Sequence, residues 1–388
     1  SQIVPGLTLA MLLKEKKVTH VNIGGNFFGR VTEALLEKPE FFNIFCDSLS
    51  VEEGEGPIIE LAKYVEGKIS IEHVPNLLYL QDNIVRETPK IKPLQLNDIH
   101  SQDLTGFPLD LYLTPEIVLS TQSSRGCYWR KCSFCDQDFG QNLNVKNIDK
   151  LINEIKLLKE NFGVSHFEFI DESINPEYLE EFSDQLIKEN LDIKWFVNAR
   201  LETTFTPEKL QKAAKAGLKM LLWGFESGSE RVMKLINKGI DVSRRLEILR
   251  NSREAGIWNF VYIFFGFPTE THEDALKTIE IIKENKDIIS SYGRSVFTLG
   301  KHTRLREDPE KFTITKIFEN EEEFSPSFQY ETSQGMDAKK ISEVANLCTA
   351  ECNKAYDNPL WMYLRYREIL FLYICKFATD VIQKARIK

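Results

Sequence analysis

A strand-then-helix pattern repeats six times through the middle of the chain. Short apolar runs rich in β-branched and aromatic residues alternate with amphipathic segments of helical period. The candidate strands begin near Ile117, His166, Ile193, Lys219, Trp258 and Ser295, and the candidate helices cover 148–159, 178–188, 207–216, 231–236 with 243–255, and 273–284. Six successive β/α units predict an α/β protein built around a partial parallel (β/α)6 barrel.

The segment ahead of the barrel, residues 1–92, alternates helices with two short strands at 18–23 and 45–51, each followed by a glycine-rich turn. Strand, glycine turn and helix are typical of a doubly wound α/β sheet. A hairpin at 77–86, turned by Asp82-Asn83, follows them. Because the first strands of a complete sheet are missing, we expect a Rossmann-like lobe that is truncated or degenerate.

Four regions are therefore expected. They are the lobe (1–92), a polar, proline-punctuated linker (93–116), the barrel (117–325) and a C-terminal helical region (326–388). In the last region we expect two helices separated by Asn358-Pro359, the second running from 360 to about 385.

Three cysteines gather in the loop after the first candidate strand. Cys127, Cys132 and Cys135 lie within nine residues, and no fourth Cys or His stands nearby to complete a structural zinc site. Three thiolates suit a cubane [4Fe–4S] cluster with one iron left open to a ligand. Basic residues on the same loop favour the thiolate forms. The alternatives are a zinc site completed from afar, or thiols that bind no metal.

This loop resembles the cluster loop of the radical S-adenosylmethionine (SAM) superfamily, in which three cysteines hold the cluster and SAM chelates the fourth iron. The usual spacing there is C-x3-C-x2-C, whereas this chain has C-x4-C-x2-C. The resemblance covers about residues 117–300 and places Phe134 near the SAM adenine. It implies further SAM contacts at the ends of the next four strands, from Asp171 and Glu172, Asn198 and Arg200, Glu226 and Ser227, and Gly266. No residue is assigned to catalysis beyond these contacts.

The resemblance also implies the chemistry. The reduced cluster passes one electron to SAM, which cleaves to methionine and a 5′-deoxyadenosyl radical, and the radical abstracts hydrogen from a substrate. An electron donor such as flavodoxin or ferredoxin is implied, with a small molecule or a peptide as substrate.

The lobe resembles the cobalamin-binding domain found ahead of many radical SAM barrels. The residues that carry this likeness, and that would approach the corrin, are Gly24, Gly25, Glu53, Gly54 and Glu55. Bound cobalamin implies radical C-methylation. A barrel without cobalamin would instead epimerise, cyclise or cross-link a natural product or peptide.

Composition and net charge narrow the classes of function that this chain can have. A net charge of −9 argues against a general polyanion binder, and so against a radical SAM enzyme acting on RNA. The chain shows no apolar run of membrane-spanning length and no signal peptide, and its seven cysteines suit a reducing cytoplasm. Cys348, Cys352 and Cys375 are interpreted as buried helix cysteines rather than a second metal site. The rival class is a non-enzymatic protein, a degenerate barrel with a structural zinc.

Overall fold

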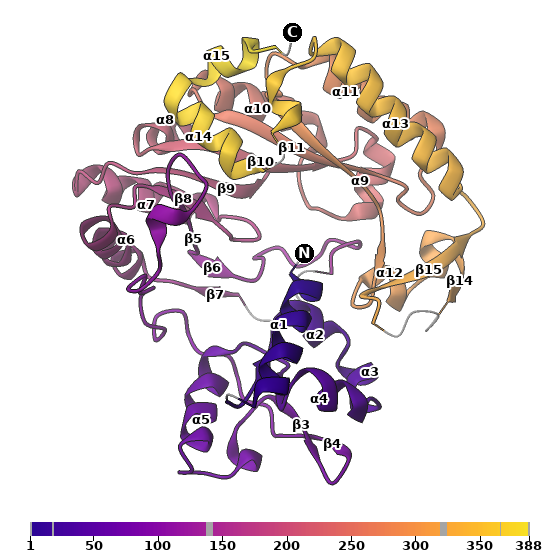
Figure 1. The fold of residues 1–388 in the computed structure, drawn as a ribbon. Coiled ribbons are helices and arrows are strands. Elements are labelled where there is room, and N and C mark those ends of the chain that lie inside the picture. Colours follow the sequence, from indigo (N-terminus) through magenta and orange to yellow (C-terminus); the bar gives the residue numbers. More distant parts are fainter. Residues whose placement is uncertain (1, 18, 137–142, 319–323, 365, 387–388) are drawn as a thin grey trace. The chain divides into compact units, whose positions relative to one another are not determined.

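A computed structural model describes residues 2–17, 19–136, 143–318, 324–364 and 366–386 (Figure 1). The chain divides into two compact units. The first comprises Ser1–Ile99 and Phe318–Gln329, and the second comprises His100–Ile317 and Tyr330–Lys388.

The second unit contains a six-stranded sheet in which every neighbouring pair is parallel. The spatial order of the strands follows the chain without reversal, which is the order of a barrel rather than of a doubly wound sheet. The partial (β/α)6 barrel is therefore confirmed. Its strands are β5 (Val118–Thr121), β8 (His166–Phe169), β9 (Lys194–Arg200), β10 (Leu218–Glu226), β11 (Trp258–Phe265) and β12 (Ser291–Val296).

Helices connect these strands, and side chains at their first residues define where several of them begin. Asn175, Thr206 and Ser229 accept hydrogen bonds from the first-turn amides, and Thr271 forms a capping box with Asp274. The helices are α6 (Ile148–Phe162), α7 (Pro176–Lys188), α8 (Pro207–Lys215), α9 (Glu230–Ile236), η3 (Val242–Arg244), α10 (Arg245–Glu254) and α11 (His272–Glu284).

One strand starts earlier than predicted. β12 begins at Ser291 rather than near Ser295, in a stretch whose serine and glycine residues carry little strand signal. Its register on β11, with Phe260 opposite Ser291, extends the strand back to that point.

Alternate side chains of the barrel strands face two different environments. Phe167 and Phe169 are buried beneath the helices, where Phe169 lies 5.4 Å from Phe182 between ring centroids. Glu168 between them points to the opposite side, which we call the inner face. Phe264 on β11 also lies on the inner face, 5.0 Å from the ring of Phe134 in the cysteine loop. The inner face is therefore the side of the sheet on which the cysteine loop packs.

In the first unit the predicted hairpin is confirmed, and it belongs to the same sheet as the two parallel strands. The turn residues Asp82 and Asn83 have φ of 52° and 59°, as a two-residue hairpin requires. The hairpin thus supplies the strands that two parallel strands alone would lack. The strands are β1 (Asn22–Ile23), β2 (Ser48–Ser50), β3 (Leu77–Gln81) and β4 (Ile84–Glu87).

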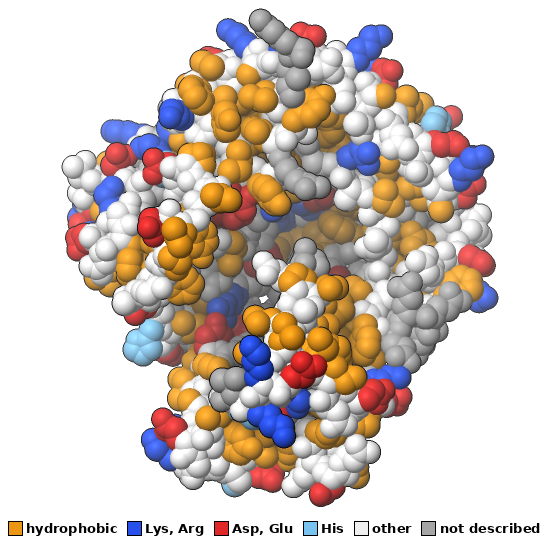
Figure 2. Space-filling model, in the orientation of Figure 1, with side chains coloured by type: hydrophobic (Ala, Val, Ile, Leu, Met, Phe, Trp, Pro, Cys, Tyr) orange, Lys and Arg blue, Asp and Glu red, His pale blue; other side chains and the backbone are white. Residues whose placement is uncertain are grey.

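Helices of the first unit cover this sheet. The strand expected at 45–51 is shorter than predicted, because Pro39 starts a helix that buries Phe41 and Phe42 and continues to Phe45. Hydrophobic side chains gather over the first helix (Figure 2), where Val4, Leu9 and Leu12 are exposed. The helices are α1 (Ile3–Lys16), α2 (Asn26–Arg30), α3 (Thr32–Leu36), α4 (Pro39–Phe45), α5 (Glu55–Val65) and η1 (Ile71–His73).

The C-terminal region expected at 326–388 begins with a strand, β15 (Ser327–Thr332), and is helical only from Ala338 onward. The single helix expected over 360–385 is also wrong. The chain breaks into η5 (Leu360–Tyr363), α14 (Arg367–Phe377) and α15 (Thr379–Lys384). Ala378 has a φ of 63°, a left-handed conformation that ends α14. The earlier helix of this region, α13 (Ala338–Ala355), buries Cys348 and Cys352 with their sulfurs 4.0 Å apart.

Short elements complete the described structure. They are η2 (Leu109–Leu111), the paired strands β6 (Ser124–Arg125) and β7 (Asn144–Val145), β13 (Leu299–Gly300), α12 (Arg304–Glu307), η4 (Glu310–Phe312), β14 (Ile314–Phe318) and β15 (Ser327–Thr332), with β13, β15 and β14 forming one sheet. Among the described residues, no helix combines the length and the apolar character needed to cross a bilayer.

Candidate functional site

The cysteine loop is fastened to the end of α9. The Ser133 amide and hydroxyl donate to the carbonyl oxygens of Ile236 and Leu235, both at 2.8 Å. Asn237, in a left-handed conformation at the helix end, donates from Nδ2 to the Lys131 carbonyl at 3.0 Å. The loop around Cys132 therefore takes its position from the helix that follows β10.

Trp129 anchors the other half of this loop. Its Nε1 donates to the Asn237 carbonyl at 2.9 Å. The ring lies where a side chain at Gly239 would be, because an added Cβ there would come within 1.9 Å of Trp129 Cζ2. Gly239 also has a φ of 69°, so the position favours glycine on both grounds.

Arg200, at the end of β9, ties that strand to the same loop. Its guanidinium carbon lies 4.6 Å from the ring centroid of Trp129, and it pairs with Glu202 at 2.6 Å. The hydroxyl of Tyr128 donates to Glu202 at 2.8 Å. Arg200 is almost fully buried, and its Nε has no hydrogen-bond partner among the residues that the structure describes.

A bulge at the end of β10 brings Glu226 to the inner face. The register with β11 shifts between Gly224 and Glu226, and Glu226 has a φ of 64°. Its carboxylate accepts a hydrogen bond from the ammonium of Lys238, and both side chains are nearly buried. This pair occupies the space beside Gly224, where an added Cβ would lie 2.0 Å from Lys238 Nζ.

Lys238 also acts on the cysteine loop. Burial raises the pKa of the Cys132 thiol to about 11, whereas the positive charge of Lys238 lowers that pKa. A cation beside the thiol favours the thiolate, the form that binds iron. The bulge, the ion pair and the cysteine loop therefore form one electrostatic unit.

Asp171, at the end of β8, is fully buried and holds the chain just before the loop. Its carboxylate accepts hydrogen bonds from the Ser123 amide at 3.0 Å, the Ser123 hydroxyl at 2.5 Å and the Ser124 hydroxyl at 2.8 Å. Burial raises the pKa of Asp171, and these hydrogen bonds oppose the rise. Asn198 donates to the Asp171 carbonyl at 2.8 Å, while Glu172 is exposed. The structure thus gives Asp171 a positioning role, and the predicted SAM contacts of Asp171, Glu172 and Asn198 stay predictions.

Ser227 lies deeper than a ligand contact needs. It is fully buried, its hydroxyl accepts from the Ser229 amide at 3.1 Å, and its carbonyl accepts from Arg245 at 2.6 Å. Ser229 in turn caps α9 and donates to Asp274 at 2.6 Å. Ser227 is therefore placed where it shapes the turn after Glu226.

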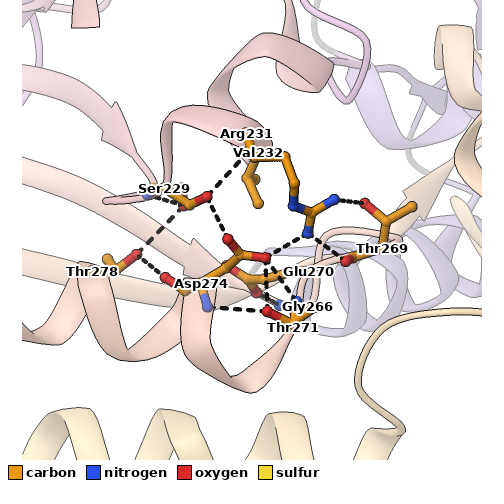
Figure 3. Close-up of polar contacts among 10 residues, drawn as sticks. Ser229, Arg231, Val232, Gly266, Thr269, Glu270, Thr271, Asp274 and Thr278 are labelled. Carbon is orange, nitrogen blue, oxygen red and sulfur yellow. Dashed lines mark hydrogen bonds and ion pairs between the residues drawn. The ribbon is translucent and has the colours of Figure 1, made fainter. Parts of the chain in front are cut away.

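Gly266, at the end of β11, turns with a φ of 87°. Its amide donates to Glu270 Oε2 at 2.6 Å, and an added Cβ would lie 2.8 Å from Ile341 of α13. Figure 3 shows the neighbouring network, in which Arg231 donates to the Thr269 carbonyl at 2.7 Å and pairs with Asp274 at 2.5 Å. The loops after β10 and β11 are thus locked together.

Several members of the site escaped prediction. Lys238, Ser123 and Glu270 carry no signal in the sequence that separates them from ordinary surface residues. They become functional candidates only because the fold buries each beside a predicted residue.

The three cysteines share one loop but are not assembled for metal binding. Within the described ranges, no three Cys, His, Asp or Glu side chains form a group that would hold a metal ion. The donor set nevertheless fits an iron–sulfur cluster, with three cysteines outside any disulfide and a neighbouring cation.

The two glycine-rich loops of the first unit lie at one edge of its sheet. Gly24 and Gly25 follow β1 and the run Glu53, Gly54 and Glu55 follows β2, and these strands are parallel neighbours. Side chains added at Gly25 or Gly54 would meet no atom within 4 Å. The loops therefore leave open space of the kind a flat ligand needs.

Comparison with known proteins decides the nature of the barrel. Residues 121–282 match the family described as the radical SAM superfamily. The barrel is a radical SAM domain. The match contains Cys127, Cys132 and Cys135 and every predicted SAM contact.

Curated relatives extend beyond this chain. An uncharacterized methyltransferase of Pyrococcus horikoshii is 29% identical over 60% of this chain and 51% of its own length. An anaerobic magnesium-protoporphyrin IX monomethyl ester cyclase of Cereibacter sphaeroides is 29% identical over 50% of this chain and 33% of its own length. The chain thus spans about half of the first relative and a third of the second.

Solved structures share the fold over most of the chain. The cobalamin-dependent SAM radical enzyme OxsB, with aqua-cobalamin and SAM bound, superposes with a TM-score of 0.67 and 12% identity, covering 98% of this chain and 65% of that chain. The radical SAM methyltransferase TsrM from Kitasatospora setae, with tryptophan substrate and a SAM analog bound, superposes with a TM-score of 0.63 and 19% identity. This match covers 78% of this chain and 60% of that chain.

Proposed function

We propose that this chain belongs to a cobalamin-dependent radical SAM methyltransferase. One observation carries the proposal. The loop with the three cysteines is fastened across the carboxyl ends of β9, β10 and β11, where it meets Arg200, the Glu226–Lys238 pair and Phe264. Arg200, Glu226 and Phe134, three of the residues that the resemblance assigns to SAM, lie on or beside this loop.

In this proposal Cys127, Cys132 and Cys135 hold a [4Fe–4S] cluster as thiolates. When bound, the cluster supplies the electron that cleaves SAM. The positive charge of Lys238 lowers the pKa of the Cys132 thiol, against the rise that burial causes, and so favours the thiolate.

The strand ends position SAM. In this proposal the Arg200 guanidinium pairs with the carboxylate of SAM, and Glu226 faces the ribose or the methionine part. Phe134 and the backbone of Gly266 bracket the adenine, supported by Phe264 and Glu270. In this proposal Glu172 and Asn198 bind the SAM ammonium. Asp171 and Ser227 do not contact SAM: Asp171 holds the chain at Ser123 and Ser124, and Ser227 shapes the turn after Glu226.

The lobe carries cobalamin in this proposal. The loops of Gly24-Gly25 and Glu53-Gly54-Glu55 present open backbone at one sheet edge, as a planar macrocycle requires. OxsB and TsrM, whose solved structures contain bound cobalamin, share the fold. Bound cobalamin supplies the methyl carrier that turns hydrogen abstraction into C-methylation.

We further propose a cytoplasmic location and an electron donor of the flavodoxin or ferredoxin type. None of the seven cysteines forms a disulfide in the described part of the chain, which suits a reducing compartment. A small-molecule substrate fits this family.

Anaerobic cobalamin titration tests the methyltransferase proposal. The reconstituted chain is expected to take up about one cobalamin, read from its visible spectrum. Gly54→Trp, which fills the open loop, should abolish uptake. Gly6→Trp also meets open space, on α1, and should preserve uptake. If no cobalamin binds while SAM is still cleaved, the cobalamin-independent alternative replaces this proposal.

A further inference from the structure

The inner face of the barrel carries polar side chains that the proposed cofactor contacts do not use. Glu168 on β8 and Tyr262 on β11 lie on this face, and Arg367 and Glu368 reach it from the first turn of α14. All four are partly or fully exposed. They therefore line a surface that a ligand can reach.

α14 packs on the inner face of the sheet. Phe371 of this helix stacks at 4.8 Å from Phe196 of β9 and 5.8 Å from His166 of β8, measured between ring centroids. At the start of the helix, Arg367 donates a hydrogen bond to the Tyr262 hydroxyl of β11. α14 also contacts β10, as Figure 1 shows. The helix thus crosses the face from β11 to β8 and fixes where Arg367 and Glu368 stand.

Two carboxyls and a guanidinium meet at this point. The Glu168 and Glu368 carboxyls are hydrogen-bonded together, and burial, followed by the charge of Glu368, raises the pKa of Glu168 to about 7. Arg367 is close enough to lower that pKa, yet its hydrogen bond goes to the neutral phenol.

Other charges of the same face are paired. Arg200 meets Glu202 at 2.6 Å, and Lys238 meets Glu226. Among the described residues, no ion pair within 4.0 Å joins Arg367 to Glu168 or to Glu368. A guanidinium and two carboxyls therefore stand side by side without a direct ion pair between them, and a ligand that carries both charges can pair with each.

The signs of these charges select the ligand. A simple anion would meet Arg367 but also two acidic side chains, and a simple cation would meet the carboxyls but also Arg367. A head group with an ammonium and a carboxylate on one carbon satisfies both. Beneath these four side chains the rings of Phe196 and Phe371 are fully buried against each other, and Phe260 is half-buried.

We propose that Glu168, Glu368, Arg367 and Tyr262 bind the head group of a free α-amino acid, the substrate of this barrel. Arg367, oriented by Tyr262, donates to the substrate carboxylate, and the substrate ammonium donates to Glu168 and Glu368. This inference rests on the proposed function, which supplies the reaction.

Binding of matched probes to the anaerobically reconstituted full chain tests the inference. L-Phenylalanine, 2-phenylethylamine and 3-phenylpropionate share a phenyl side chain and differ only in which charges they carry. Isothermal titration should give L-phenylalanine an affinity at least about tenfold above either analogue, the scale of one charged hydrogen bond.

Two substitutions should each remove one part of the preference for L-phenylalanine, either the part due to its carboxylate or the part due to its ammonium. In Arg367→Gln, L-phenylalanine should bind no better than 2-phenylethylamine, because the partner of the carboxylate is gone. In Glu168→Gln, it should bind no better than 3-phenylpropionate. Arg386→Gln, an exposed arginine further along the C-terminal region, is the matched control and should keep the wild-type order.

Equal affinity of the three probes, or the absence of saturable binding by every proteinogenic L-amino acid, would overturn the inference. SAM cleavage and iron content are measured on the same preparation. Failure of the proposed function would appear as wild-type protein that cleaves no SAM, whereas the titration requires no SAM and is judged separately.

Discussion

Lys238 donates a hydrogen bond to Glu226 across the space left by the missing side chain of Gly224. Both partners are nearly buried, so each depends on the other for its charge to be tolerated. The lysine follows α9 and the glutamate ends β10, and the pair stands beside the Cys132 thiol. Through this pair the strand end and the cysteine loop are electrostatically coupled.

Removing one partner should cost more than removing both. Lys238→Met leaves a buried carboxylate unpaired and is expected to lower the free energy of unfolding by about 3 kcal/mol. The double variant Lys238→Met/Glu226→Gln should recover most of that loss. Denaturant melts of the single and double variants provide the measurement. Strictly additive losses would show that the two side chains do not interact.

Gly239→Ala should loosen the cysteine loop rather than the fold. The added methyl group meets the ring of Trp129, a side chain that moves with the loop. Gly256→Ala is a matched control, because Gly256 also has a positive φ but meets no atom within 4 Å. Both variants should lose about 1–2 kcal/mol to backbone strain, and only Gly239→Ala should lose iron on gel filtration after reconstitution. Equal iron retention in the two variants would contradict this role of Trp129.

Asp171→Asn should weaken the start of the loop. The carboxylate accepts hydrogen bonds from Ser123 and Ser124 that an amide satisfies only in part. The loss of stability is expected to be about 1–3 kcal/mol, with reduced iron content. Ser123→Ala should act in the same direction and less strongly. An Asp171→Asn protein with wild-type stability and iron, but weaker SAM binding, would instead favour a direct contact with SAM.

Glu270 should make stability depend on pH. Burial raises the pKa of this carboxyl to about 8, so the folded chain keeps a proton that the unfolded chain releases near its usual pKa. Stability should therefore fall as the pH rises from about 5 to about 8, by on the order of 1 kcal/mol per pH unit for this group. In Glu270→Gln the pH dependence should be weaker, while the Gly266 amide keeps an acceptor. Parallel curves for the two proteins would contradict the assignment.

The sequence allowed the barrel to be predicted because strand and helix periods differ and alternate regularly. His166 and Trp258, for instance, begin strands where the apolar runs begin. The break of the last helix at Ala378 was missed, because nothing local forbids alanine from continuing a helix. The position of α14 along the inner face and the burial of Lys238 both depend on tertiary packing. Neither has a local signal.

The strand ends that carry the candidate site could be predicted from the sequence, but the hydrogen bonds and ion pairs among its residues could not. The strand-end motifs named Arg200, Glu226 and Gly266, since parallel strands bring their carboxyl ends together. Which polar atoms pair behind them depends on packing. Asp171, predicted to contact SAM, has its carboxylate hydrogen-bonded by Ser123 and Ser124.

Iron analysis after anaerobic reconstitution tests the central claim most directly. The account predicts about four irons per wild-type chain, reductive cleavage of SAM, and loss of both in Cys127→Ala, Cys132→Ala and Cys135→Ala. The same substitutions at Cys348, Cys352 and Cys375 should leave both unchanged. Tightly held zinc without iron, or a Cys127→Ala protein that keeps its iron and still cleaves SAM, would contradict the account.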